Sequence, residues 1–379
     1  MPRILIVTGE ASGDLHGANL AAALKAQRPD LELLGVGGSK MAAAGVQLMK
    51  GIERLDAMGL PGLAHLRQAL RTYRALARFF KENRLDAVVF IDNPGLNLRL
   101  ARAAKRAGHR VIYYIAPQIW AWHASRIHLI KRVVDLVLVI LPFEEAIYRD
   151  AAVPCRFVGH PVLDAIAPAY DRSELRRRFG VEPGARVVGL LPGSREREVR
   201  DLLPIMLDAA SRINRSGLPG GPLTFLLAQA ASVPSGLIDE LTAGAGVKVQ
   251  VVRDQPHEVM AASDLLLAAS GTATLQAAVI GTPTVLVYRT TWLTYRVARA
   301  LVKVRWIGLA NLVAGRSVMP ELIQYDATPG RLAEEAGRLL SDETASRAMK
   351  DAFKEVRASL GAPGASRRAA EAIVAECQA

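Results

Sequence analysis

Short apolar runs alternate with amphipathic, alanine- and leucine-rich stretches along most of the chain. In the first half these runs are nearly continuous in apolar residues and too short for helices, so they predict strands buried on both faces. We expect these strands at residues 3–8, 31–36, 86–92, 110–115 and 135–141. Because helical patterns separate them, the alternation predicts a parallel sheet covered by helices on both faces.

The same pattern starts again after residue 180, which indicates a second domain of the same class. Its strands are expected at residues 186–191, 223–228, 247–252, 264–268 and 284–288. The segment 159–178 contains Pro161 and Pro168 and is the expected connection, while residues 330–379 carry helical signals without strand signals. We therefore predict an α/β protein of two doubly wound, Rossmann-like domains that face a central cleft and are followed by a helical tail.

Composition narrows the class of partner. The 379 residues are 51% apolar and 22% charged, as in an ordinary globular protein. Lys and Arg number 48 against 36 for Asp and Glu, so the net charge of +12 predicts an acidic partner. Nucleic acid is disfavoured, because aromatic residues make up only 5% and no recognition module occurs. Two cysteines, Cys155 and Cys377, exclude a disulfide framework and favour a reducing compartment.

Two basic amphipathic stretches, 63–82 and 292–306, suit contact with an anionic membrane surface. Ordinary surface helices with solvated basic faces explain them equally well. The uncharged stretch 265–288 is long enough to cross a bilayer, but turns at 270–272 and 281–283 predict strand, helix and strand instead. No secretory signal is visible.

Two loops of the first domain follow expected strands. The glycines at positions 9 and 13 would let backbone approach a ligand, although a tight strand-to-helix turn explains them as well. Asp92 ends the strand at 86–92, where a catalytic carboxylate belongs in such a sheet. The alternative is an Asx-turn or helix cap that leads into Pro94.

Two loops of the second domain suit a diphosphate. Gly193, Ser194 and Arg195 combine a turn with a guanidinium, and a small-residue turn at 270–272 opens a helix directly after a strand. Asn311 could add a polar contact, or it could simply cap a turn.

Several chemistries are excluded by missing motifs. The chain has no G-x-G-x-x-G, P-loop or G-x-S-x-G, which disfavours oxidoreductases and serine hydrolases. It has no D-x-D and no histidine pair with ligand spacing, so we expect neither a metal nor a cofactor.

Eight motifs in order resemble the lipid A disaccharide synthase family, bacterial glycosyltransferases of the two-domain GT-B fold, and the resemblance spans essentially the whole chain. The motifs are Gly9-Glu10-Ala11-Ser12-Gly13-Asp14, Ile91-Asp92-Asn93-Pro94, Pro117-Gln118-Ile119-Trp120-Ala121-Trp122, Leu141-Pro142-Phe143-Glu144, Cys155-Arg156-Phe157-Val158-Gly159-His160, Leu191-Pro192-Gly193-Ser194-Arg195, Ala269-Ser270-Gly271-Thr272 and Asn311-Leu312-Val313-Ala314-Gly315-Arg316.

The resemblance implies an inverting transfer from UDP-2,3-diacylglucosamine to 2,3-diacylglucosamine 1-phosphate, which releases UDP. It implies an acceptor-side domain at 1–165, a UDP-sugar domain at 166–345, and a tail at 346–379 that returns toward the first domain. It places the base at Asp92 and an apolar patch for acyl chains at 58–70. The implied diphosphate and nucleotide contacts are Gly193, Ser194, Arg195, Ser270, Gly271, Thr272, Gln276 and Asn311. The implied acceptor-side residues are Glu10, Ser12, Gly13, Asp14, Gln118, Trp120 and Trp122.

The resemblance also implies a cytoplasmic protein held peripherally on the cytoplasmic face of the inner membrane, with a homodimer left open. One position departs from the family: Gln276 stands where a glutamate usually accepts hydrogen bonds from ribose hydroxyls. The alternatives are another GT-B enzyme of UDP-N-acetylglucosamine, namely a peptidoglycan transferase or a 2-epimerase, and a noncatalytic relative that binds anionic lipid.

Overall fold

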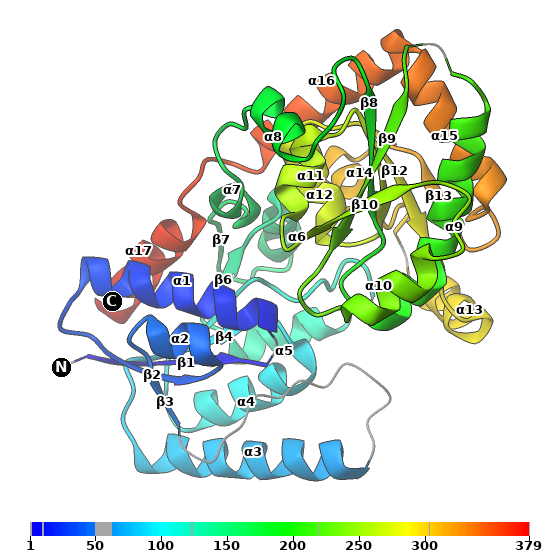
Figure 1. The fold of residues 1–379 in the computed structure, drawn as a ribbon. Helices are drawn as coiled ribbons and strands as arrows, with labels where there is room; N and C mark the ends of the chain where they lie inside the picture. The colour runs from blue at the N-terminus through cyan, green and yellow to red at the C-terminus, as the bar shows by residue number, and fades with distance from the viewer. Residues whose placement is uncertain are drawn as a thin grey trace. The chain divides into compact units, whose positions relative to one another are not determined.

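The computed structural model describes residues 2–9, 11–49, 63–122, 124–218, 220–302 and 304–378. The chain divides into two compact units, one formed by Met1–Asp164 with Leu360–Ala379 and the other by Ala165–Ser359. Each unit is built on one parallel sheet with helices on its faces (Figure 1). The predicted class, two doubly wound parallel-sheet units with a helical C-terminal region, is confirmed.

The first unit holds a seven-stranded sheet in the order β3-β2-β1-β4-β5-β6-β7. Its strands are β1 (Arg3–Thr8), β2 (Glu32–Val36), β3 (Gln47–Leu48), β4 (Ala87–Ile91), β5 (Val111–Tyr114), β6 (Leu136–Val139) and β7 (Cys155–Phe157). Its helices are α1 (Ala11–Gln27), α2 (Ser39–Ala43), α3 (Leu63–Glu82), α4 (Pro94–Arg106), α5 (Arg126–Val133), α6 (Pro142–Asp150), α7 (Val162–Ala165), which ends at the junction, and α17 (Ala365–Gln378).

Alternate side chains of β4 enter two different layers of this unit. Val88 and Phe90 pack into the layer of α3, α4 and α5, whereas Val89 and Ile91 pack into the layer of α1 and α17. Helices α1 and α17 come from opposite ends of the chain and lie side by side (Figure 1). A strand that is apolar at every position therefore lies at the centre of the sheet, with helices on both faces.

The second unit holds a six-stranded sheet in the order β10-β9-β8-β11-β12-β13. Its strands are β8 (Arg186–Leu191), β9 (Leu223–Gln229), β10 (Val249–Arg253), β11 (Leu265–Ala269), β12 (Thr284–Tyr288) and β13 (Glu321–Ile323). Its helices are α8 (Arg172–Arg178), α9 (Glu196–Arg215), α10 (Ser235–Thr242), α11 (Pro256–Ala262), α12 (Thr272–Ile280), α13 (Trp292–Leu301), α14 (Leu309–Ala314), α15 (Pro329–Ser341) and α16 (Glu343–Ser359).

Both sheets have a topological switch point. In the first sheet, the chain runs from β1 to β2 toward one edge and from the neighbouring strand β4 to β5 toward the other edge. In the second sheet, the connections that follow β8 and β11 diverge in the same way. Loops at the carboxyl ends of such strands flank the crevice where α/β sheets bind ligands. These four strands are followed by the loop that begins at Gly9, the turn at Asp92, and the loops at 193–195 and 270–272.

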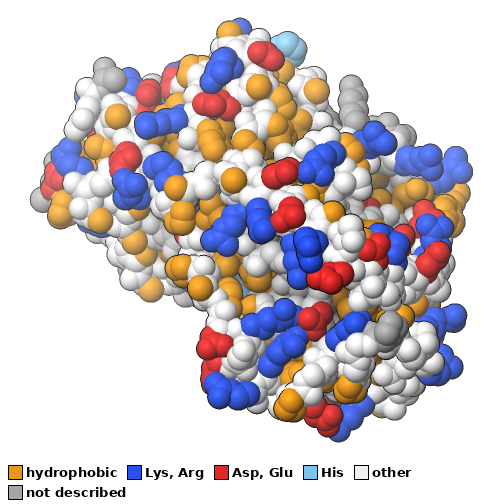
Figure 2. All heavy atoms as spheres, turned by 90° about the horizontal axis from the view of Figure 1, so that it is seen from above, with side chains coloured by type: hydrophobic (Ala, Val, Ile, Leu, Met, Phe, Trp, Pro, Cys, Tyr) orange, Lys and Arg blue, Asp and Glu red, His pale blue; other side chains and the backbone are white. Residues whose placement is uncertain are grey.

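Figure 2 shows how charged side chains are distributed on one face of the molecule. On the face drawn in Figure 2, lysine and arginine side chains (blue) are spread among acidic (red) and hydrophobic (orange) ones. Within the described parts of the chain, none of the helices has both the length and the apolar composition needed to cross a membrane.

Candidate functional site

The loops after β8 and β11 line one cavity in the second unit. Its volume is about 340 Å³, which is in the size range of small-molecule sites. The residues predicted to bind the diphosphate and nucleotide line it, with the exception of Asn311. Those that line it are Gly193, Ser194, Arg195, Ser270, Gly271, Thr272 and Gln276. The structure therefore brings two loops, which lie far apart in the sequence, to one place.

Gly193 shapes the first of these loops. Its φ of +114° is a conformation that favours glycine, and a Cβ there would lie 2.6 Å from Oε2 of Glu198. Arg195 Nη1 donates to Oε1 of the same glutamate at 3.0 Å. The turn is thus tied to the first turn of α9, and this tie holds the Arg195 guanidinium at the cavity.

The second loop ends at the N-terminus of α12. The N-cap residue, Gly271, has a φ of +138°, and a Cβ at this position would meet nothing within 4 Å. The first amides of a helix lack intrahelical acceptors and carry partial positive charge, so they stabilise an anion placed beside them. Gln276 lies one turn further along α12 and lines the same cavity.

The same cavity is also lined by residues that were not predicted from the sequence. Three of them, Ala228, Pro256 and Met260, give the cavity an apolar wall suited to a flat aromatic ring such as a nucleobase. Glu198 adds a carboxylate. The sequence could have pointed to Ala228, because this residue lies near the carboxyl end of β9, the strand that pairs with β8.

Asn311 requires a correction. Its side chain is fully buried, and Nδ2 donates to the Met319 carbonyl at 3.0 Å and to Oε1 of Glu321 at 2.7 Å. Its Oδ1 accepts from the amides of Val318 and Met319. Both polar atoms are therefore used inside the protein, so Asn311 orders the segment before β13 and does not reach the cavity.

Asp92 follows β4 in a strained turn of the first unit. Asp92 and Asn93 have φ values of +50° and +43°, a conformation that costs about 1–3 kcal/mol for each residue other than glycine. The Asp92 carbonyl accepts hydrogen bonds from Tyr113 Oη at 2.6 Å and from Asn97 Nδ2 at 2.8 Å. Because both donors belong to buried side chains, the backbone of the turn is held firmly.

The Asp92 carboxyl group has an altered proton affinity. Burial raises its pKa, and a hydrogen bond from the Asn93 amide offsets part of that shift. A carboxylate whose pKa is raised accepts a proton more readily than an exposed one, which suits a general base.

The glycine loop after β1 packs against this turn. A Cβ on Gly9 would lie 2.2 Å from Nδ2 of Asn93, and a Cβ on Gly13 would lie 2.3 Å from Oγ1 of Thr8. The loops after β1 and β4 therefore approach each other at the switch point. Ser12 is exposed beside them, and Glu10 lies outside the described residues.

Asp14 also requires a correction. Its side chain is buried, Oδ1 accepts from the amides of Gly38 and Met41, and Oδ2 accepts from the amide of Lys40. A carboxylate with three backbone donors at the start of α2 is a helix cap, so Asp14 is not open to an acceptor substrate.

The tryptophan motif is anchored by a buried carboxyl group. Trp120 Nε1 donates to Oε1 of Glu144 at 3.0 Å, and its ring meets Phe143 edge-on at 5.0 Å. Burial raises the pKa of Glu144 to about 7, although this hydrogen bond works in the other direction. Gln118 and Trp122 are exposed on the same segment. Glu144 had no assigned role in the sequence, because its contact with Trp120 exists only in the fold.

Two further expectations can be placed. Among the described residues, no group of three or more His, Cys, Asp or Glu side chains is arranged to hold a metal ion. Of the predicted apolar patch at 58–70, residues 58–62 lie outside the described residues, and Leu70 is 45% exposed.

Comparisons with known proteins agree with the resemblance. A model of the lipid-A-disaccharide synthetase family matches residues 4–376. The chain is 42% identical over 373 residues to the lipid-A-disaccharide synthase of Geobacter metallireducens, with 98% of this chain and 96% of that protein covered. It is 42% identical over 374 residues to that of Myxococcus xanthus, with 98% and 97% covered.

Solved structures of UDP-sugar enzymes share the fold. Phytolacca americana UGT2, complexed with UDP-2fluoro-glucose and pterostilbene, has a TM-score of 0.63 at 13% identity with 100% of both chains covered. The UDP-GlcNAc 2-epimerase of Neisseria meningitidis has a TM-score of 0.59 at 13% identity with 98% of both chains covered. At such identities these likenesses establish the two-domain GT-B fold alone.

Proposed function

Because the chain belongs to the lipid-A-disaccharide synthase family, we propose that its two units divide one glycosyl transfer between them. The enzyme joins UDP-2,3-diacylglucosamine to 2,3-diacylglucosamine 1-phosphate, and it releases UDP and the β-1′,6-linked disaccharide 1-phosphate of lipid A biosynthesis. In our proposal the second unit holds the UDP part of the donor and the first unit presents the acceptor. The cavity that gathers the loops after β8 and β11 carries this assignment.

The proposed base is Asp92. Inversion from an α-linked donor to a β-linked product fits a single displacement, in which the acceptor 6-hydroxyl attacks C1 of the donor sugar. The Asp92 carboxylate takes the hydroxyl proton as the new C–O bond forms, and the bond from C1 to the diphosphate breaks with its electron pair leaving on UDP. A positioned base of this kind contributes roughly 10²–10⁴-fold to the rate.

The proposed diphosphate site stabilises the charge that develops on UDP. The amide groups at the start of α12, the turn at Gly193 and the Arg195 guanidinium all line the cavity. Donors fixed in advance at the place where charge develops can contribute about 3–4 kcal/mol each. In our proposal the Gln276 side chain, which lines the same cavity, accepts a hydrogen bond from a ribose hydroxyl.

We also propose that the enzyme works at an anionic membrane surface, on the cytoplasmic face of the inner membrane. Both substrates are lipids, and the chain carries a net charge of +12. In the second unit α13 exposes Trp292, Leu293 and Val297 next to basic residues, which is the composition of a helix that lies on anionic lipid.

A reconstituted reaction tests the proposal. The purified chain is incubated with both substrates in detergent micelles, and disaccharide and UDP are followed by mass spectrometry. We expect Asp92→Asn to lower turnover by at least about 10²-fold, because an amide cannot accept the proton, while the UDP affinity stays at its wild-type value.

Asp150→Asn, at the exposed C-terminal end of α6, is the matched control and should leave turnover unchanged. Wild-type turnover in Asp92→Asn would remove Asp92 from the chemistry. A 2-epimer of the UDP-sugar formed without acceptor would replace the transferase assignment by an epimerase.

A further inference from the structure

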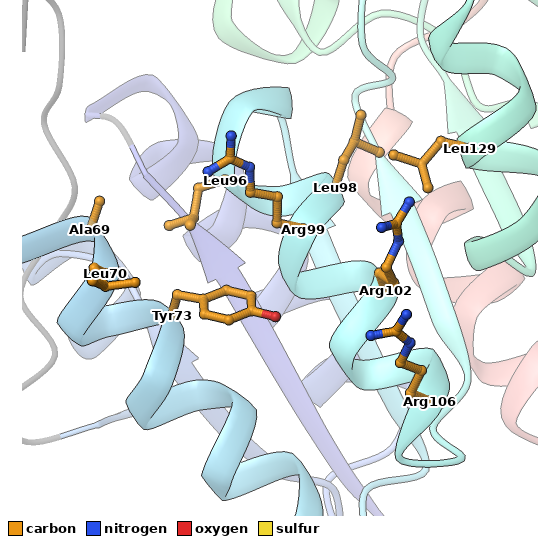
Figure 3. Close-up of a pocket in the computed structure, with 9 residues that line it drawn as sticks. All are labelled: Ala69, Leu70, Tyr73, Leu96, Leu98, Arg99, Arg102, Arg106 and Leu129. Atoms are coloured by element: carbon orange, nitrogen blue, oxygen red, sulfur yellow. The ribbon is translucent and has the colours of Figure 1, made fainter. Parts of the chain in front are cut away.

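A groove in the first unit combines an apolar floor with a row of arginines. It runs between α3, α4 and α5 and encloses about 530 Å³. We call it the arginine groove; it is lined by Ala69, Leu70, Tyr73, Leu96, Leu98, Arg99, Arg102, Arg106 and Leu129. Figure 3 shows the Tyr73 ring reaching from α3 into the space beside α4, with the three arginines distributed along α4.

Among the described residues, no acidic side chain is paired with the arginines of the groove. Arg99, Arg102 and Arg106 follow one another at steps of three and four along α4, are exposed, and form no ion pair with any residue that the structure describes. A second hollow of about 360 Å³ continues from Arg102 and Arg106 and adds Lys105 and Arg132. Lys105 is paired with Asp135, and none of the described residues that line either hollow is acidic. Such a concentration of cations attracts an anionic ligand.

The floor of the groove is apolar, and it suits hydrocarbon rather than phosphate. Leu70 is 45% exposed there, and Leu96 and Leu129 are partly buried next to the arginines. Free phosphate would leave these leucines in water, and an acyl chain would cover them, with each buried CH₂ contributing about 0.8 kcal/mol in general. The ligand that satisfies both halves of the groove carries a phosphate and hydrocarbon in one molecule.

The groove begins next to the proposed base. Helix α4 starts at Pro94, two residues after Asp92, and its first turn supplies Leu96 to the groove. Arg99 lies five residues beyond Pro94, which is a rise of about 7.5 Å along a helix. A molecule whose phosphate lies on these arginines can therefore keep another part of itself close to the Asp92 turn.

On this basis we propose that the arginine groove binds the acceptor substrate, with its phosphate on Arg99 and Arg102 and an acyl chain along Leu70, Leu96 and Leu129. This inference rests on the proposed function, since it takes its ligand from the reaction. A cavity of this volume matches one ligand molecule, whereas a bilayer surface would meet a flat or convex patch. The donor diphosphate already has its own donors in the second unit.

The test compares two pairs of substitutions that change the net charge equally. Arg99→Ala with Arg102→Ala removes two groove cations, and Arg74→Ala with Arg78→Ala removes two exposed cations of α3 that do not line the groove. Binding of 2,3-diacylglucosamine 1-phosphate, and of the same molecule without its phosphate, is measured by native mass spectrometry from detergent. Steady-state turnover is measured on the same samples.

We expect the groove variant to bind the phosphorylated acceptor at least about 10-fold more weakly, which is the usual loss when a charged hydrogen bond is removed. Its KM for the acceptor rises by the same factor as the affinity falls, and its KM for the UDP-sugar stays unchanged. The variant no longer prefers the phosphorylated acceptor over the one without phosphate. The control pair behaves like the wild type in every measurement. Unaltered melting curves show that the exposed substitutions leave the fold intact.

Equal acceptor affinity in wild type and groove variant would overturn the inference. So would an equal loss for acceptors with and without phosphate, because the arginines would then not read the phosphate. Loss of binding to phosphatidylglycerol vesicles with unchanged acceptor affinity would assign the arginines to the membrane surface instead. If the wild type binds the acceptor through the groove but forms no disaccharide, the proposed function fails and the groove assignment stands.

Discussion

Among single residues, Arg195 offers the most direct check on the diphosphate cavity. Its guanidinium pairs with Glu198, and the bound diphosphate would compete with that carboxylate for the same donors. We expect Arg195→Ala to weaken UDP binding by about 10- to 100-fold and to lower kcat/KM at least as much, because a charge-assisted contact is lost in both states. Calorimetric titration with UDP and steady-state kinetics measure the two effects.

The control for this substitution lies two residues further on. Arg197 is 74% exposed, pairs loosely with Asp201 and does not line the cavity. Arg197→Ala should therefore leave UDP affinity at its wild-type value. If Arg195→Ala behaved in the same way, the phosphate assignment of this loop would be wrong.

A second prediction at this scale concerns the buried carboxyl of Glu144. Burial raises its pKa from 4.5 to about 7, so the folded protein holds this proton more tightly than the unfolded chain does. The contribution of Glu144 to stability is therefore complete below pH 4.5 and is lost as the pH rises to about 7. A shift of this size corresponds to about 3–4 kcal/mol.

Urea denaturation at several pH values measures this effect. We expect Glu144→Gln to remove the decrease in the free energy of unfolding between pH 5 and pH 7, because an amide does not ionise. Glu145→Gln, at the neighbouring and partly exposed position, should retain it. A wild-type slope in Glu144→Gln would show that another group titrates in this range.

Asn311 and Asp14 mark the limit of what sequence reasoning can predict for single residues. Both lie where binding residues are expected, but the direction of each side chain depends on backbone amides elsewhere in the chain, at 318–319 and at 38–41. No local pattern records such partners. The loops at Gly193 and Gly271 were easier to place beside one cavity, because the position of each loop at the end of a strand is sufficient for that.

At the scale of elements, the central strands could be predicted, whereas the edge strands other than β10 could not. Strands β1, β4, β8 and β11 are buried on both faces, and their apolar runs are plain in the sequence. The strands that were missed, β3, β7 and β13, have two or three residues and lie at the edges of the sheets. An edge strand pairs on one side only, so neither its length nor its polarity needs to follow the pattern of a core strand.

Helix α13 carries the prediction that belongs to this scale. Trp292, Leu293 and Val297 are at least half exposed, and Arg296 stacks on the Trp292 ring. If α13 lies on anionic lipid, replacing Trp292 and Leu293 by serine removes about 1.5–3 kcal/mol of apolar burial at each position. We therefore expect binding to phosphatidylglycerol vesicles, measured by flotation, to fall at least about 10-fold.

Leu15→Ser is the control for α13, because this leucine is 38% exposed and lies in the first unit. It should leave vesicle binding unchanged. Wild-type flotation of the α13 variant would move the membrane contact to another surface.

At the scale of the whole molecule, both ends of the chain build the first unit. Asp164 accepts hydrogen bonds from the amides of Gly364 and Ala365 at the start of α17, and the Leu360 carbonyl accepts one from the amide of His160. These hydrogen bonds join residues 160–164, where the chain leaves the first unit, to residues 360–365, where it returns to this unit. Sequence reasoning could show that the tail is helical, but these contacts arise only when the sheet is assembled.

Removal of residues 360–379 tests this dependence. Ala369, Ala370 and Ile373 of α17 are buried in the same cluster as β1 and β4, so a chain that ends at Ser359 exposes part of the core of the first unit. We expect this unit to melt at a much lower temperature and disaccharide synthesis to be lost. Residues 165–359 keep their own sheet and the UDP cavity, so UDP should still bind and should raise the melting temperature of the second unit alone.

Arg367→Ala combined with Glu371→Ala serves as the control, because this exposed ion pair on α17 can be removed while the buried face of the helix is kept. That variant should melt and react like the wild type.

Two melting transitions in differential scanning calorimetry, of which UDP shifts only one, would show that the units unfold separately. Full synthesis by the shortened chain would contradict the role of α17, and loss of UDP binding would show that the second unit depends on the first.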